Sequence, residues 1–149
     1  MSSPAYNIFG PLDSVLGGQQ TMAYILLALV LLNVITRMLA HRRNVKEADD
    51  GGASTMSRHP LHTFSNVALL LSTFYYTTLD QHTGIVASML IVGMFITDFF
   101  EYESRKVDAR REIKIEPPKG AIVASMFVLL YVGYLSLFQF VEPFWSAVV

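Results

Sequence analysis

Most of this chain consists of four long apolar blocks, which cover residues 21–40, 60–79, 84–103 and 120–141. A transmembrane helix needs about 20 predominantly apolar residues, so each block is long enough for one crossing. Only 15% of the 149 residues are charged, whereas a soluble domain has about 25% charged residues. The pattern predicts an all-α membrane protein, a four-transmembrane-helix bundle with up-down connectivity.

The N-terminal segment and the first connection between the blocks are polar or rich in Gly and Pro. Residues 1–20 are predicted to form an extracytoplasmic N-terminal segment, either a short interfacial helix or a loose tail. Residues 21–149 then form the four-helix transmembrane domain. Residues 41–57 carry a basic cluster, an acidic cluster and a Gly-Gly pair, which predicts a solvated loop with Ser57 as the N-cap of the second helix.

The later connections differ in character. Residues 80–84 are a short polar break, which predicts a tight hairpin between the second and third helices. No Gly or Pro interrupts the charged residues after position 93, so the third helix is expected to extend into the cytoplasm as far as Arg111. Residues 112–116 alternate polar and apolar, which predicts a short strand or an extended connector.

All eleven lysine and arginine residues lie around two of the connections. Five surround the first connection and six lie in the third, whereas the N-terminal segment, the second connection and the C-terminus have none. Cytoplasmic loops carry an excess of Lys and Arg. We therefore expect a multi-pass protein of the cell membrane, with both termini outside and the two basic loops in the cytoplasm.

Ionisable side chains gather near the predicted cytoplasmic ends of the spans. Asp98 and Glu101 share a face of the third helix, because residues three apart lie on the same side. His59 and His62 have the same spacing at the start of the second helix, and Arg37 lies near the end of the first. These five residues are candidates for one inner-boundary polar cluster, although span length does not fix the helix rotations that would bring them together.

Several interpretations of this cluster stay open. In the structural one, Asp98 pairs with Arg37 or a histidine and Glu101 pairs with Arg105, since intramembrane charges are usually paired. The functional ones are a proton relay, a site for an anionic headgroup or quinol, and a divalent metal site. The chain has no cysteine, which excludes thiolate chemistry. The sequence therefore assigns no catalytic residue, no metal ligand and no cofactor.

The third connection and the C-terminus suggest contacts with lipid. Basic side chains in the third connection are candidates for contact with anionic lipid, namely Arg105, Lys106, Arg110 and Arg111. Acidic residues interleave them and no aromatic platform accompanies them, so nucleic-acid binding is not expected. Residues 142–145, Glu-Pro-Phe-Trp, are typical of an aromatic anchor at a membrane surface.

Five strings together resemble a known family: LAHRRNV, SRHPLH, FITDFFEYESRKVDARR, EPPKGA and EPFWSA. They are similar to a family of small, functionally uncharacterised multi-pass membrane proteins of halophilic archaea. The resemblance covers nearly the whole chain from Phe9 onward. It implies the four-span layout and a lineage, but no activity, cofactor or catalytic residue.

Three hypotheses about function follow. The first is a non-enzymatic membrane protein, either an accessory or structural subunit of a larger complex or a homo-oligomer that associates through small-residue faces. The alternative is a small proton or ion conduit that uses the Asp, Glu and His residues of the cluster. The second alternative is a metal-binding or electron-transfer subunit. The expected partners are the lipid bilayer and other membrane subunits or further copies of the chain.

Overall fold

The computed structural model describes residues 18–52, 54 and 56–148, and in these residues it contains four long helices. They are α2 (Gly18–Gly51), α3 (Pro60–Leu79), α4 (Gln81–Arg110) and α5 (Lys119–Val148). The prediction of an all-helical protein is confirmed. Of the predicted N-terminal segment, residues 1–20, the first 17 lie outside the described residues, and the last three begin α2 instead.

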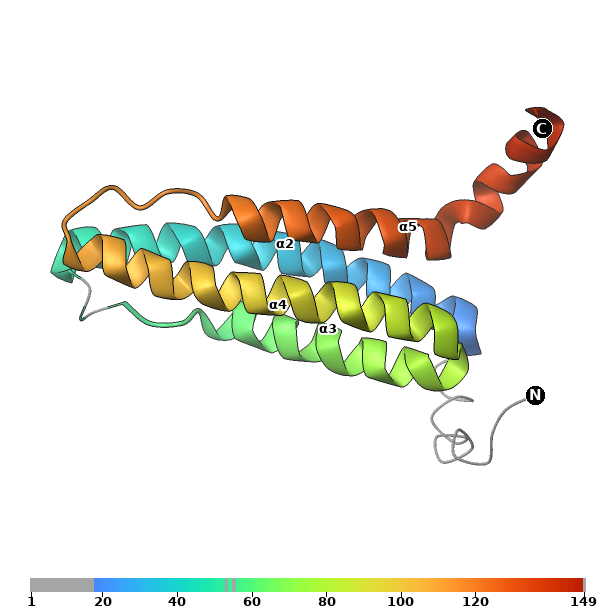
Figure 1. The fold of residues 1–149 in the computed structure, drawn as a ribbon, viewed down its shortest axis with the longest axis horizontal. Coiled ribbons are helices and arrows are strands. Elements are labelled where there is room, and N and C mark those ends of the chain that lie inside the picture. Colours follow the sequence, from blue (N-terminus) through green and yellow to red (C-terminus); the bar gives the residue numbers. More distant parts are fainter. Residues whose placement is uncertain (1–17, 53, 55, 149) are drawn as a thin grey trace.

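The four helices lie side by side along one long axis (Figure 1). The packed neighbours are α2 with α3, α3 with α4, α4 with α5, and α5 with α2. Helices α2 and α4 therefore face each other across a diagonal. Ten buried apolar side chains fill one half of the interior. They are Met22, Ala23, Leu26, Val30, Leu69, Tyr76, Ile91, Met94, Val128 and Val132.

Three helices of the described chain are long and apolar enough to cross a membrane: α2 from Gln20, the whole of α4, and α5 as far as Phe138. Helix α3 is not among them. Its sequence includes His, Asn, Ser and Thr among its apolar residues, and these lower its average hydropathy. The predicted fourth crossing therefore depends on how the polar residues of α3 are placed.

Helix α2 is longer than predicted, because residues 41–51 continue the helix instead of forming a loop. Arg43 Nε donates to Glu47 Oε1 at 3.1 Å, an i,i+4 pair that supports the added turns. Gly52 then has a φ of +78°, a conformation that glycine adopts without steric cost at a helix end. The break that ends the helix is thus the Gly-Gly pair and not the start of the charged residues.

The cap of α3 also differs from the prediction. His59, not Ser57, is the N-cap, and its Nδ1 accepts a long hydrogen bond from the His62 N–H at 3.4 Å. Pro60 occupies the first helical position, where its missing N–H costs nothing. At the other end, Asp80 alone separates α3 from α4, and its Oδ1 accepts the Thr83 N–H at 3.3 Å. This single residue makes the predicted hairpin very tight.

Helix α4 ends at Arg110, one residue before the predicted end. Glu112 follows with a φ of 58°, and the Ile113 N–H donates to the Asp108 carbonyl at 3.0 Å. This is a Schellman arrangement with glutamate at a position that usually holds glycine. Residues 113–118 have no regular secondary structure, so the extended connector is observed and the strand is not.

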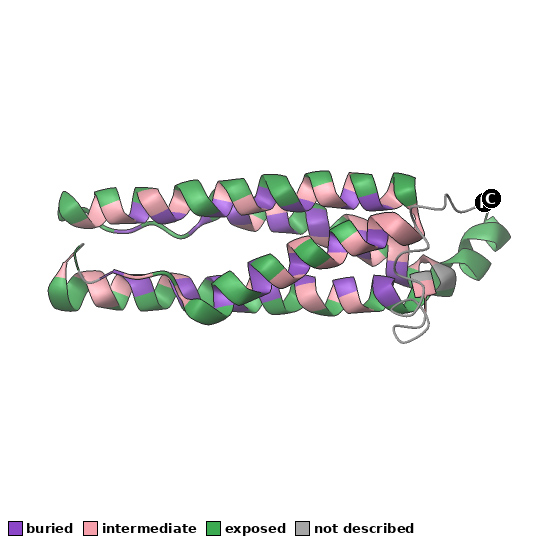
Figure 2. Cartoon of the chain, turned by 90° about the horizontal axis from the view of Figure 1, so that it is seen from below, coloured by how far each residue is buried: buried purple, intermediate pink, exposed green. Residues whose placement is uncertain are grey.

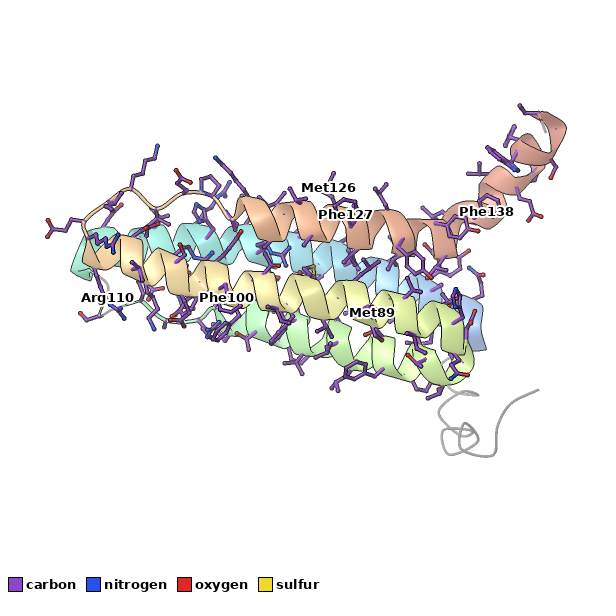
Figure 3. All side chains as sticks on the ribbon, in the orientation of Figure 1. Met89, Phe100, Arg110, Met126, Phe127 and Phe138 are labelled. Carbon is purple, nitrogen blue, oxygen red and sulfur yellow. The ribbon has the colours of Figure 1, made fainter. Side chains whose placement is uncertain are left out.

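The outer surface of the bundle is apolar and much of its interior is polar. Figure 2 shows buried residues as stripes along the inner sides of the helices. Among the outward side chains labelled in Figure 3, Met89, Phe100, Met126 and Phe127 are 56–70% exposed. The following polar side chains are buried: Asn33, Thr36, Arg37, Asn44, His62, Ser65, Asn66, Thr73, Asp98, Arg105, Ser125 and Ser136.

Candidate functional site

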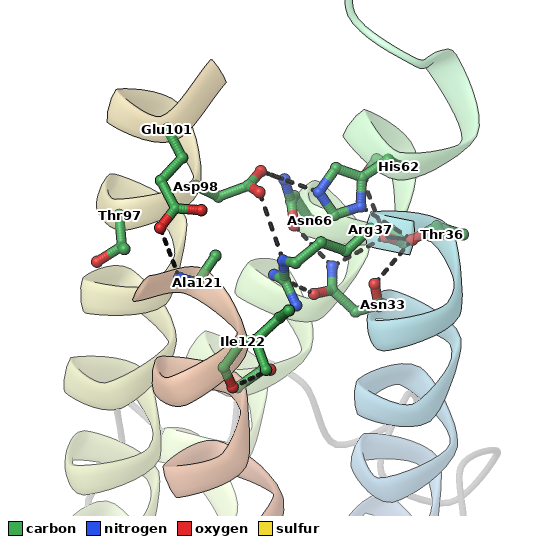
Figure 4. A network of polar contacts seen from close by, with 12 residues as sticks. Asn33, Thr36, Arg37, His62, Asn66, Thr97, Asp98, Glu101, Ala121 and Ile122 are labelled. Carbon is green, nitrogen blue, oxygen red and sulfur yellow. Dashed lines mark hydrogen bonds and ion pairs between the residues drawn. The ribbon is translucent and has the colours of Figure 1, made fainter. Parts of the chain in front are cut away.

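Helices α2 and α3 each present a group of three polar side chains to the bundle interior. On α2 the group is Asn33, Thr36 and Arg37, and on α3 it is His62, Ser65 and Asn66. Both groups have i, i+3, i+4 spacing, which places their members on one helix face. All six residues are at most 7% exposed. Together with Asp98 of α4 they form what we call the polar layer (Figure 4).

Asp98 is the centre of the polar layer. Its Oδ2 lies 2.9 Å from His62 Nε2 and accepts a hydrogen bond from Asn66 Nδ2 at 3.1 Å. Its Oδ1 accepts a longer bond from Arg37 Nε at 3.4 Å. A carboxylate has several acceptor sites, so one side chain connects α2, α3 and α4.

Asn33 extends the polar layer between α2 and α3. Its Oδ1 accepts a hydrogen bond from Arg37 Nη2 at 2.7 Å, and its Nδ2 donates to Asn66 Oδ1 at 2.6 Å and to Ser65 Oγ at 2.9 Å. On the far side of the imidazole, Thr36 Oγ1 lies 2.9 Å from His62 Nδ1. Both ring nitrogens of His62 are therefore engaged, which fixes the orientation of the ring.

Two buried atoms next to this network have no hydrogen-bond partner among the described residues: Arg37 Nη1 and Glu101 Oε2. Leaving a buried polar group unpaired costs about 1–3 kcal/mol.

Glu101 lies on the α5 side of α4, away from the centre of the polar layer (Figure 4). Its Oε1 accepts the backbone N–H of Ala121 at 3.1 Å. The first N–H groups of a helix have no partner within it, and a negative charge there is favourable. Glu101 thus caps α5 from a neighbouring helix, instead of pairing with Arg105.

Gly120 makes this cap sterically feasible. A Cβ atom at position 120 would lie 2.6 Å from Glu101 Oε1 and 3.2 Å from Thr97 Cγ2. We expect Gly120→Ala to push the carboxylate away from the start of α5 and to lower the free energy of unfolding by about 1 kcal/mol, the usual cost of losing a cap. Denaturant unfolding in mixed micelles measures the change.

Gly133→Ala is the matched control for this prediction, because nothing lies within 4 Å of a Cβ at position 133 of the same helix. It should leave stability unchanged or raise it slightly, since alanine favours helix. Equal losses in the two variants would contradict the role assigned to Glu101.

The connection between α2 and α3 contacts the C-terminal part of α4. Arg105 is buried, and its Nε donates to Asn44 Oδ1 at 3.1 Å, while Asn44 Nδ2 donates to the Ser57 carbonyl at 3.0 Å. The guanidinium of Arg58 lies over the Tyr102 ring at 4.1 Å from its centre, a favourable cation–π geometry. These contacts explain why the last turns of α2 stay folded.

The structure gathers only some of the residues singled out in the sequence. It brings Arg37, His62 and Asp98 together, places His59 at the α3 cap, and turns Glu101 toward α5. Among the basic candidates for lipid contact, Arg105 points inward, which removes it from that set. Lys106 lies 3.8 Å from Glu103 Oε2, and Arg110 and Arg111 are exposed.

No group of three or more His, Asp or Glu side chains suitable for a metal ion occurs in the described residues. In the polar layer, one histidine and one carboxylate are accompanied by the Arg37 guanidinium, whose positive charge opposes a cation. The arrangement can hold charge and fix helix positions, and it does not provide a ligand set for zinc or iron.

A family model matches residues 3–149, so the chain belongs to the family described as Domain of unknown function (DUF7313). No curated protein and no solved structure matches the chain. The family therefore assigns no role to the polar layer.

Proposed function

We propose that this chain is a non-enzymatic integral membrane protein, an up-down bundle of four transmembrane helices that serves as an accessory or structural subunit. The observation that carries the proposal is the placement of polarity, with apolar side chains facing outward and many polar ones facing inward. Water favours the reverse arrangement. Lipid favours this one, because polar side chains in a membrane face the bundle interior.

Helix α3 supplies the strongest support for a fourth crossing. Its outward side chains include Leu61, Phe64, Val67, Leu71 and Phe74, with exposed fractions of 44–65%. Its polar residues His62, Ser65, Asn66 and Thr73 are among the buried ones. The most polar residues of α3, His62 and Asn66, thus lie on its inner face, and large apolar side chains dominate the surface it would present to lipid.

The same proposal places both basic connections in the cytoplasm and both termini outside, as the positive-inside rule predicts. The far ends of α2 and α4, which Arg105 and Asn44 join, would then form the cytoplasmic docking element for partners.

The packing favours a structural role over a conduit. The polar layer occupies one level of the bundle. On one side of it the interior holds ten packed apolar side chains, together with Thr73 and Ser136, whose hydroxyls donate to carbonyls of their own helices. A proton or ion path would need polar groups or water through that region. In addition, Asp98 accepts hydrogen bonds from three side chains, which suits a fixed helix connector.

One small-residue pair of α5 is not available for self-association. Ala121 and Ser125 have the small-xxx-small spacing that allows close helix contact, but both are buried inside this chain. Outward side chains such as Met126, Phe127 and Leu130 remain on the lipid-facing side of the helix.

Mass spectrometry of the protein after gentle extraction from its native membrane tests the proposal. We expect a fixed set of co-purifying polypeptides, or a homo-oligomer of fixed size, with no stoichiometric metal. Metal at a constant ratio, lost in a His62→Ala variant that still folds, would overturn the non-metal assignment. A partner-free monomer would overturn the subunit assignment.

A further inference from the structure

The last turns of α5 form an arm that extends beyond the bundle (Figure 1). The arm comprises residues 140–148, and all of them are exposed in the structure. Phe144 is 73% exposed, Trp145 is 58% exposed and Val148 is 85% exposed. Large apolar side chains of this kind need a covering surface, and the described part of the chain supplies none.

Pro143 gives a physical reason for the departure of the arm from the axis of α5. It lies inside the helix, where proline removes one backbone hydrogen bond and its ring collides with the carbonyl four residues earlier. The helix bends near that point in Figure 1. The bend turns the arm away from the other helices, so it does not continue the packed part of α5.

The arm is amphipathic. Phe140 and Phe144 are four residues apart, and Val141, Trp145 and Val148 follow the same periodicity on the adjoining side. These five side chains form one continuous apolar face. The opposite face carries Glu142 and Ser146, which are also four residues apart.

We propose that this arm lies in the membrane interface, in the plane of the bilayer, with its aromatic face among the lipid acyl chains. The inference rests on the proposed function, since it needs the bundle to span the membrane. The arm leaves the bundle at the end where α3 turns into α4 (Figure 1), which is a membrane boundary in that proposal. Tryptophan and amphipathic helices favour this depth.

Lipid fits the arm better than a second copy of the chain does. A standard protein interface buries about 800 Å² on each partner, and the exposed parts of the five apolar side chains of the arm fall short of that area on their own. The arm carries no basic residue and one acidic residue, Glu142. Apolar and aromatic contacts, not attraction to anionic headgroups, therefore hold it in place.

The chain contains a single tryptophan, so its emission reports on Trp145 alone. The full chain is reconstituted in phosphatidylcholine vesicles with bromine atoms placed either near the headgroup or at the bilayer centre. We expect blue-shifted emission, stronger quenching by the shallow bromines, and little quenching by aqueous iodide. Strong iodide quenching would overturn the proposal. If Trp145 is protected from the bromines and from iodide, and this protection is lost when the protein is diluted with lipid, the arm packs against a second copy of the chain instead.

A matched pair of variants tests the amphipathic face. Phe144→Ser should shift the emission of Trp145 to the red and increase iodide quenching, whereas Ser146→Ala on the polar face should change neither. An alkaline wash distinguishes a failure of the proposed function from a failure of the proposal for the arm alone. Release of the protein from the vesicles would contradict the proposed function, while a retained bundle whose Trp145 is quenched by iodide contradicts the arm alone.

Discussion

Asp98→Leu is expected to lower the free energy of unfolding by about 3–5 kcal/mol, the usual cost of removing one partner of a buried ion pair. Arg37 is only 2% exposed and keeps its charge within the bundle when the carboxylate is lost. The same substitution removes the acceptor of His62 and Asn66. Unfolding of the purified protein in mixed micelles with increasing dodecyl sulfate measures the loss.

A double substitution separates the ion pair from the rest of the polar layer. Arg37→Leu combined with Asp98→Leu should be more stable than Asp98→Leu alone, because replacing both members of a buried pair by apolar groups is often neutral. Glu103→Gln is the control, since Glu103 makes its ion pairs at the surface. It should cost at most about 1 kcal/mol. Similar losses for Glu103→Gln and Asp98→Leu would contradict the buried pair.

Gly84→Ala is expected to destabilise the protein by about 1–3 kcal/mol, the range for overpacking a well-packed site. A Cβ at this position would overlap the backbone of Thr77. Backbone atoms cannot rotate aside as the end of a side chain can, so α3 and α4 would have to separate. The separation would also strain the Asp80 cap that both helices share.

Gly93→Ala, nine residues further along the same helix, provides the comparison. Nothing lies within 4 Å of a Cβ at position 93, and alanine is more favourable than glycine in a helix by up to about 1 kcal/mol. The variant should be as stable as the parent or slightly more so in the same dodecyl sulfate titration. If Gly84→Ala is tolerated as well as Gly93→Ala, the close contact assigned to α3 and α4 at this position is contradicted.

The helices could be predicted from the sequence, because apolar blocks of this length are too long for single strands. It was less informative about where helices end. The charged residues after Ala40 suggested a loop, yet they are good helix formers and the helix ends only at the Gly-Gly pair. The cap of α3 was misplaced by two residues because His59 acts as a cap and Ser57 does not.

The polar layer shows a different limit of sequence reasoning. The sequence pointed to Arg37, His62 and Asp98 but missed the contributions of Thr36, Ser65 and Asn66. The shared i, i+3, i+4 spacing of polar residues in α2 and α3 was the available signal. The sequence could not assign different places to His59 and His62, because they are three positions apart on one helix face. Only the packed rotation of α3 directs His62 inward.

The partner of Glu101 was also beyond the reach of sequence reasoning. Spacing along α4 favoured an ion pair with Arg105, four residues away. In the structure the carboxylate accepts the Ala121 N–H, which lies 20 residues further along the chain. Gly120 permits this contact, but a glycine at the start of a helix does not indicate which side chain approaches it.

The central claim, four membrane crossings with α3 among them, is tested most directly by cysteine labelling. The chain has no native cysteine, so single variants Ser54→Cys, His82→Cys and Lys114→Cys can each be probed in intact cells with a membrane-impermeant maleimide. Four crossings predict that the cysteine at position 82 reacts and that those at positions 54 and 114 react only after permeabilisation. If α3 does not cross, positions 54 and 82 will react from the same side and position 114 from the other, which contradicts the account.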